Sequence, residues 1–165
     1  MALDADPSRR SCALPGAAPG IAYGLTFLAF LVHNISELVA DLPLWAAARG
    51  VPVTQAQYAN AMAGLTVAAG VLLLVARAQP FARPLQILTA VLTGALLANV
   101  ASHAVGSLVT ATAMPGLWTA LALVLPSAAW LLKRLPLTPR DKTLSALAGA
   151  LAMPLVAGAA LLIAA

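Results

Sequence analysis

The chain has 165 residues, of which 62% are hydrophobic and only 8% are charged, and its mean hydropathy is +0.94. These values exclude an ordinary water-soluble domain and predict an integral membrane protein. The formal net charge of +4 comes from basic residues in short clusters between apolar segments, which suits membrane orientation better than nucleic-acid binding. We therefore expect the lipid bilayer as a partner, and no nucleic acid.

The beginning of the chain, residues 1–20, mixes charged residues with Pro and Gly and is predicted to be a cytoplasmic tail. The apolar segment after it is longer than the apolar core of a signal peptide and contains His and Glu, so we expect a first helix that is retained. Cys12 is the one cysteine and cannot form an internal disulfide, so we interpret it as a free thiol.

The rest of the chain offers about five windows that reach the roughly 20 apolar residues needed to cross a bilayer. The predicted spans are 21–40, 55–76, 84–106, 110–132 and 143–165. Between the third and fourth spans, only Gly106 interrupts the apolar pattern before Pro115, so we expect a very tight turn around Ser107. The sequence thus predicts an all-α fold, a polytopic membrane helical bundle that forms a single domain over residues 21–165.

The distribution of basic residues predicts the orientation of this bundle. With five spans, Arg49 lies alone on one side of the membrane, and eight basic residues share the other side. These eight are Arg9, Arg10, Arg77, Arg83, Lys133, Arg134, Arg140 and Lys142. The positive-inside rule then predicts a cytoplasmic N-terminus and an external C-terminus, and we expect a bacterial inner (plasma) membrane.

Two pairs of polar residues lie inside predicted spans, and each pair has i, i+4 spacing. His33 with Glu37 and Asn99 with His103 each share one helix face. Spans one and three both run outward, so the two pairs should lie at the same depth in the outer leaflet. Ionisable groups at such depth are unfavourable without a partner or a cavity, so these residues are candidates for a functional site.

Further polar residues are expected near the same level. Span two runs inward, which brings its early residues Gln57, Tyr58 and Asn60 into the outer half of the membrane. Asp41 follows Glu37 by one helical turn and extends the polar stripe to the interface. Three helices should therefore contribute to one polar layer.

The chemistry of this layer depends on Glu37, which is the only glutamate in the chain. Two histidines and one carboxylate are the ligand set of several catalytic zinc and non-haem iron sites. We therefore predict His33, Glu37 and His103 as ligands of a divalent metal (Zn or Fe), with Glu37 as the catalytic carboxylate. Three residues are candidates for a weak ligand or for a partner that orients an imidazole: Asn99, Asp41 and Asn60.

A structural interpretation of the same residues is also open. His33 and Glu37 could form a hydrogen bond along their own helix, and Asn99 and His103 could tie span three to its neighbours. Several hydroxyl residues are interpreted as bonding to the backbone of their own helix, namely Ser36, Thr89, Thr93 and Ser102.

The two motifs resemble those of the HXXEE family of small bacterial membrane proteins, which has a His-x-x-Glu-Glu motif on an early span and an Asn-x-x-x-His motif further on. Here the first reads His33-Asn34-Ile35-Ser36-Glu37 and the second Asn99-Val100-Ala101-Ser102-His103. Ser36 stands at the position of the first motif glutamate, which leaves a single carboxylate in the motif. The resemblance implies a metal-binding or catalytic membrane site but supplies no reaction.

Three functions follow as hypotheses. The leading one is a membrane-embedded, metal-dependent hydrolase, for which a lipid-like small molecule would suit the depth of the site. The second is a proton-coupled carrier in which Glu37 and the histidines change protonation. The third is a non-catalytic membrane partner whose polar layer only specifies helix packing.

Overall fold

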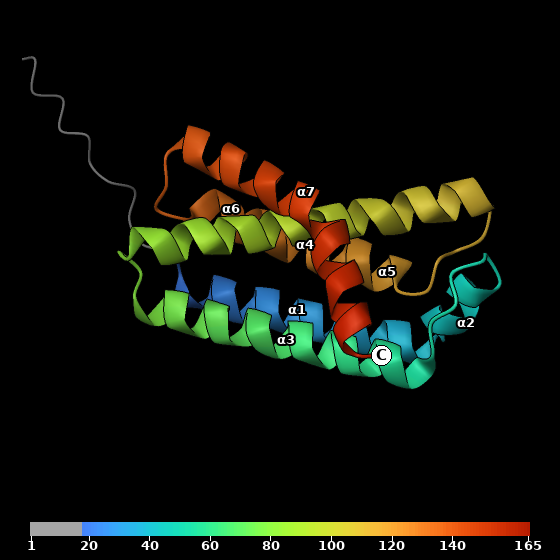
Figure 1. Cartoon of the computed structure of the whole chain (residues 1–165). Helices are drawn as coiled ribbons and strands as arrows, with labels where there is room; N and C mark the ends of the chain where they lie inside the picture. Colours follow the sequence, from blue (N-terminus) through green and yellow to red (C-terminus); the bar gives the residue numbers. More distant parts are fainter. Residues whose placement is uncertain (1–17) are drawn as a thin grey trace, which may run out of the picture.

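The computed structural model describes residues 18–165, and all regular elements in this range are helical (Figure 1). They are α1 (Gly20–Val39), α2 (Leu42–Ala47), α3 (Gln55–Ala78), α4 (Arg83–Thr110), α5 (Leu117–Thr119), the π-helix η1 (Ala120–Val124), α6 (Leu125–Arg134) and α7 (Pro139–Ile163). The all-α fold class is confirmed. Cys12 and most of the predicted tail lie outside the described residues.

Four helices, α1, α3, α4 and α7, are long and apolar enough to cross a membrane. They correspond to the first, second, third and fifth predicted spans. Their outward faces carry large apolar side chains, such as Leu151 on α7 and Leu74 on α3, which are 77% and 65% exposed. A surface of this kind is consistent with an integral membrane protein, since lipid rather than water would cover it.

The boundary between the third and fourth spans differs from the sequence-based prediction. The expected turn around Ser107 is absent, because α4 continues through this residue to Thr110 and the connecting loop is 111–116. An isolated glycine such as Gly106 is tolerated within a helix, so it does not end α4. The chain instead leaves the helix at Ala111, which has a left-handed conformation with φ of +50°.

The fourth predicted span, 110–132, starts later and is less regular than expected. Helical structure begins at Leu117 and passes through α5, η1 and α6 before it ends at Arg134. Pro126 lies in the first turn of α6, directly after the π-helix. Proline has no N–H to donate to the preceding turn, and a π-helical turn is a recognised way for a helix to absorb such a local irregularity.

The helices pack in two layers, with α1 beside α3 and α4 beside α6, and α7 crosses α4 on the outside (Figure 1). Close approach of α4 and α7 depends on Gly94 and Gly149, because a Cβ at either position would overlap with backbone atoms of the opposite helix. The second half of α7 turns toward α3 (Figure 1), where the Gln57 side chain donates a hydrogen bond to the Leu161 carbonyl over 2.8 Å. Small residues at a crossing are typical of membrane helix packing.

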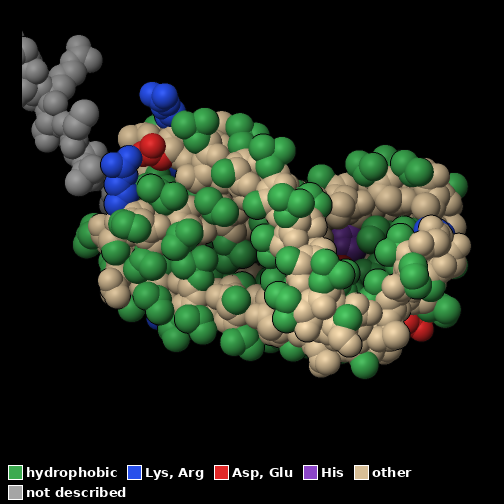
Figure 2. Space-filling view, viewed as in Figure 1, with side chains coloured by type: hydrophobic (Ala, Val, Ile, Leu, Met, Phe, Trp, Pro, Cys, Tyr) green, Lys and Arg blue, Asp and Glu red, His purple; other side chains and the backbone are tan. Residues whose placement is uncertain are grey.

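The charges lie mainly at one end of the bundle (Figure 2). We call this the basic end, where α3 and α6 finish and α4 and α7 start, and where Arg83 pairs with Asp141 at 3.1 Å. The opposite end, which we call the α2 end, contains α2 and the loop 111–116. Among the described basic residues, only Arg49 lies there.

Candidate functional site

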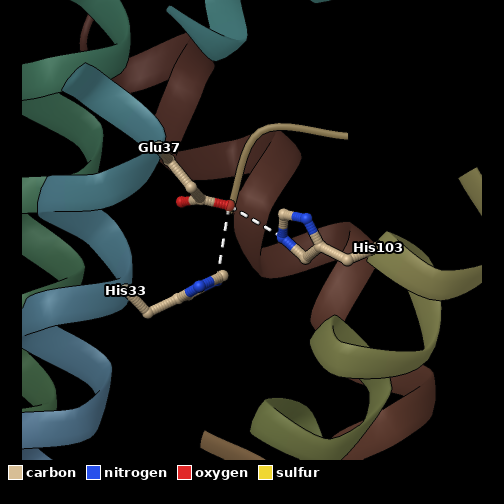
Figure 3. A group of neighbouring side chains, drawn as sticks. All are labelled: His33, Glu37 and His103. Carbon is tan, nitrogen blue, oxygen red and sulfur yellow. Dashed lines mark ion pairs between the residues drawn. The ribbon is translucent and has the colours of Figure 1, made fainter. Parts of the chain in front are cut away.

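Three buried ionisable side chains converge near the α2 end of the bundle (Figure 3). His33 and Glu37 come from adjacent turns of α1, and His103 comes from α4. Glu37 Oε1 lies 3.4 Å from His33 Nε2 and 2.8 Å from His103 Nε2. The three residues are at most 3% exposed, and we refer to them as the triad. Residues of the two i, i+4 motifs thus meet at one level of the bundle.

Helix periodicity explains the first contact, and packing explains the second. Residues i and i+4 lie on one face, so α1 by itself places His33 one helical turn before Glu37 on the same face. The two imidazole rings, one from α1 and one from α4, meet edge to face, with centroids 4.9 Å apart and planes inclined by 80°. His103 reaches the same carboxylate oxygen because α4 packs against α3 and against the helical segment after the loop, and both of these also contact α1.

Tyr58 of α3 holds the other oxygen of the carboxylate. Its hydroxyl donates a hydrogen bond of 2.6 Å to Glu37 Oε2, and the Tyr58 side chain is buried. The carboxylate is therefore fixed with one oxygen toward both histidines and the other toward the tyrosine. The sequence placed Tyr58 at this depth but gave no sign that it would contact Glu37.

Thr119 contacts the opposite nitrogen of His33. His33 Nδ1 lies 3.1 Å from Thr119 Oγ1, and this hydroxyl donates to the Gly116 carbonyl over 2.9 Å. When Thr119 gives its proton to this carbonyl, its oxygen accepts from His33 Nδ1. Nε2 of His33 faces Glu37, and the Asn99 amide nitrogen lies 2.9 Å from it.

Sequence reasoning missed Thr119 altogether. It lies 86 residues from His33 along the chain, as a single threonine in an apolar segment, and no spacing links the two. Ser36 was expected to bond its own helix, and it does so at the His33 carbonyl over 2.7 Å. The same hydroxyl also lies 2.7 Å from Thr119 Oγ1. Thr89, Thr93 and Ser102 likewise bond backbone carbonyls of their own helix.

Gly116 covers the triad from the side of the loop. Its φ of +86° is in the left-handed region that favours glycine. A Cβ at this position would lie 2.7 Å from Glu37 Cγ, 3.0 Å from His33 Cε1 and 3.1 Å from His103 Cε1. The backbone of Gly116 can therefore touch all three residues only because it has no side chain.

A groove of about 550 Å³ lies on the other side of Gly116. We call it the α2 groove. It is lined by Ala40, Asp41, Leu44, Trp45, Ala48, Ala113, Met114, Pro115, Gly116 and Trp118. The end of α1, the helix α2 and the loop 111–116 thus form its walls, and a single glycine separates it from the triad.

The remaining predicted site residues are not all at the triad. Asn99 contacts His33, as described above. Asp41 is exposed, caps α2 by accepting a 3.2 Å hydrogen bond from Leu44 N, and lines the α2 groove instead. Asn60 is exposed, and no hydrogen bond joins it to the triad among residues 18–165. Glu37 is therefore the last residue of the polar stripe on α1 that takes part in the triad.

The donor set suits a divalent metal. The three candidate ligand atoms lie within 4.8 Å of one another. Ligands at typical zinc distances of about 2.0–2.1 Å lie roughly 3.3 Å apart in a tetrahedron, so the observed separations need only small adjustments. His33 points Nε2 toward Glu37, while its Nδ1 lies 3.1 Å from Thr119 Oγ1, and a partner on the second ring nitrogen is usual for metal-binding histidines. His103 Nδ1 is buried, and no residue in the described part of the chain forms a hydrogen bond with it.

Comparison with known proteins identifies the family. A family model described as a protein of unknown function with HXXEE motif matches residues 24–131, a range that contains the whole triad, Thr119 and Gly116. Neither a curated protein nor a solved structure matches the chain. Because the matched range covers well over half of its length, the chain belongs to the HXXEE family of proteins of unknown function.

Proposed function

We propose that this protein binds a divalent metal ion, Zn or Fe, through His33, Glu37 and His103, and uses it in hydrolase-type chemistry within the membrane. The observation that carries the proposal is the convergence of two imidazole nitrogens and one carboxylate oxygen within 4.8 Å in a buried site. No lysine or arginine pairs with Glu37 in the described part of the chain. A buried carboxylate requires compensation, and a metal cation would provide it.

The surrounding hydrogen bonds support this proposal. Tyr58 fixes Glu37 so that Oε1 faces the histidines, and Thr119 fixes His33 so that Nε2 does. Such outer contacts orient the ligands and raise their affinity for a metal. A site that served only helix packing would need these hydrogen bonds. It would not need the three candidate metal-ligand atoms to point toward one place.

A divalent metal held by this set would activate a water molecule and polarise the substrate bond. The protein's own contribution is to position and to handle protons. Glu37 Oε2 accepts a hydrogen bond from Tyr58, so these two side chains form a path for a proton beside the ligands. Since Ser36 stands at a motif glutamate position, Glu37 has to serve both as a ligand and as the proton-handling carboxylate.

We further infer the orientation and the location. The cluster of basic residues at one end of the bundle favours a cytoplasmic basic end in a bacterial inner membrane. The triad and the α2 groove would then lie in the outer leaflet, in reach of lipid-like substrates.

Elemental analysis of detergent-purified protein tests metal binding. We expect near-stoichiometric metal in the unchelated wild type and its loss in His33→Ala and His103→Ala, with the helical circular dichroism spectrum retained. Asn60→Ala is the matched control, because Asn60 is an exposed polar residue of α3 and its loss should leave the metal content unchanged.

The same measurement separates the competing functions. Absence of metal in the wild type, together with a large loss of thermal stability in both histidine variants, would refute the metal proposal and assign the triad to helix packing. Absence of metal with stable variants would instead direct attention to proton-coupled transport, which flux measurements in proteoliposomes would address.

A further inference from the structure

We propose that the α2 groove binds a membrane lipid whose headgroup carries an ammonium group, and that Asp41 recognises this group. The inference deepens the proposed function, because such a lipid would be the substrate delivered to the triad. It rests on the position of the groove, the nature of its walls, and the charges that lie in it and beside it.

The position of the groove connects it to the triad. Gly116 lines the groove on one side and lies against Glu37 and both histidines on the other. The loop that carries Gly116 is held by the Met114 amide, which donates to Ser107 Oγ over 2.9 Å, and by the bond between Arg49 and Thr112. A ligand in the groove is therefore one backbone layer away from the candidate metal ligands.

The walls of the groove suit an amphiphile at the membrane interface. Most lining residues are apolar, and Leu44 and Trp118 are 67% and 72% exposed at its border. Tryptophan is enriched where a membrane protein meets the headgroup region. The groove lies where α1 ends and α4 has just ended, so it sits at this interface. Its volume of about 550 Å³ is within the range of small-molecule sites.

The charge of the groove selects the headgroup. Among residues 18–165, Asp41 is the only charged side chain that lines it. Its Oδ1 accepts from Leu44 N, and no ion pair engages Asp41 within residues 18–165. An exposed carboxylate beside apolar walls attracts an ammonium group.

Trp45 forms part of the apolar wall of the groove. The Arg49 guanidinium stacks over its ring at 3.8 Å and helps to fix it. A positive charge therefore stands beside this wall, where it would attract the phosphate of a headgroup whose ammonium group meets Asp41.

Lipid binding by the delipidated, detergent-solubilised full chain tests the proposal. Short-chain phosphatidylethanolamine and phosphatidylglycerol are titrated while tryptophan fluorescence is recorded in a Trp130→Phe background, which leaves Trp45 and Trp118 as the reporters. We expect about five-fold tighter binding of phosphatidylethanolamine, the scale of one exposed ion pair. Equal affinities, or tighter binding of phosphatidylglycerol, would overturn the proposal.

Asp41→Asn is the decisive variant. Asn accepts the same capping bond and tolerates the φ of +53° found at this position, so the substitution removes only the charge. We expect the preference to vanish in Asp41→Asn and to persist in the control Asp141→Asn, which lies at the basic end. A preference that survives in Asp41→Asn would refute the role of Asp41.

A further variant separates this proposal from the metal proposal. His33→Ala should lose the metal and keep the lipid preference, because His33 does not line the groove. Lipid selectivity in a wild-type protein that holds no metal would support the groove while refuting the metal site, and metal binding by the wild type without lipid selectivity would do the reverse.

Discussion

Thr119 shows how one hydroxyl orients the candidate metal ligand His33. Its Oγ1 lies 3.1 Å from Nδ1, and the ring held in this way directs Nε2 toward Glu37. Ser36 lies within hydrogen-bond distance of the same hydroxyl, so it belongs to the surroundings of His33 and is not one of the three candidate donors.

Replacement of Thr119 by Val should weaken metal binding with little effect on the fold. Valine has a similar shape but cannot accept from His33 Nδ1, and loss of such a contact typically lowers metal affinity by about 10–100-fold. Competition with a chromophoric chelator measures the change. Thr119→Ser should retain most of the affinity, as should Thr143→Val, which removes an exposed hydroxyl at the start of α7. Equal affinities in Thr119→Val and wild type would contradict this role.

Gly116→Ala should disrupt the triad from the side of the loop. The new Cβ would meet Glu37 Cγ at 2.7 Å, in addition to the cost of about 1–2 kcal/mol for a left-handed non-glycine residue. We expect the metal content to fall well below that of wild type. Gly50→Ala is the control, because Gly50 also has positive φ, at +81°, but a Cβ there meets nothing within 4 Å. Elemental analysis measures the metal content of both variants. Gly116→Ala combines the clash with the backbone strain, whereas Gly50→Ala introduces the backbone strain alone.

At the scale of whole helices, the crossing of α4 and α7 shows the same dependence on the absence of a side chain. Gly94 and Gly149 allow the two backbones to touch, and α7 otherwise buries little of its surface. Membrane helices associate mainly through such close packing, since lipid is as apolar as their side chains. α4 carries His103 and Asn99, so the crossing also helps to hold one half of the candidate site.

Gly149→Ala should destabilise the protein by roughly 1–3 kcal/mol, because the helices must separate to accommodate a methyl group. Gly158→Ala is a matched control on the same helix, where a Cβ would meet nothing within 4 Å. Unfolding of the two variants in mixed detergent, followed by circular dichroism, measures the difference. A Gly149→Ala variant as stable as Gly158→Ala would show that the crossing tolerates separation.

At the scale of the molecule, the two ends of the bundle differ in charge and in architecture. The basic end contains the Lys and Arg clusters, whereas the α2 end holds the triad, the α2 groove and both Trp45 and Trp118. The side of the membrane that the α2 end faces therefore decides from which leaflet a lipid could reach the groove.

Cysteine labelling in whole cells tests the orientation on a Cys12→Ser background. Val51→Cys at the α2 end and Phe81→Cys at the basic end use residues that are 55% and 78% exposed. We expect a membrane-impermeant maleimide to label position 51 in intact cells and position 81 only after permeabilisation, as the positive-inside rule requires. The reverse pattern would move the triad to the cytoplasmic leaflet.

The sequence by itself determined the helical membrane class, the four long spans and the i, i+4 pairs, because these depend on composition and on local periodicity. It could not locate the end of α4 or the irregular helix after it, since a left-handed residue and a π-turn leave little trace in an apolar pattern. It also could not reveal Tyr58, Thr119 and Gly116 as neighbours of the triad, or the separation of Asp41 from it. Those contacts join segments far apart in the chain, and only the tertiary packing of α1, α3, α4 and the loop 111–116 decides which side chains meet.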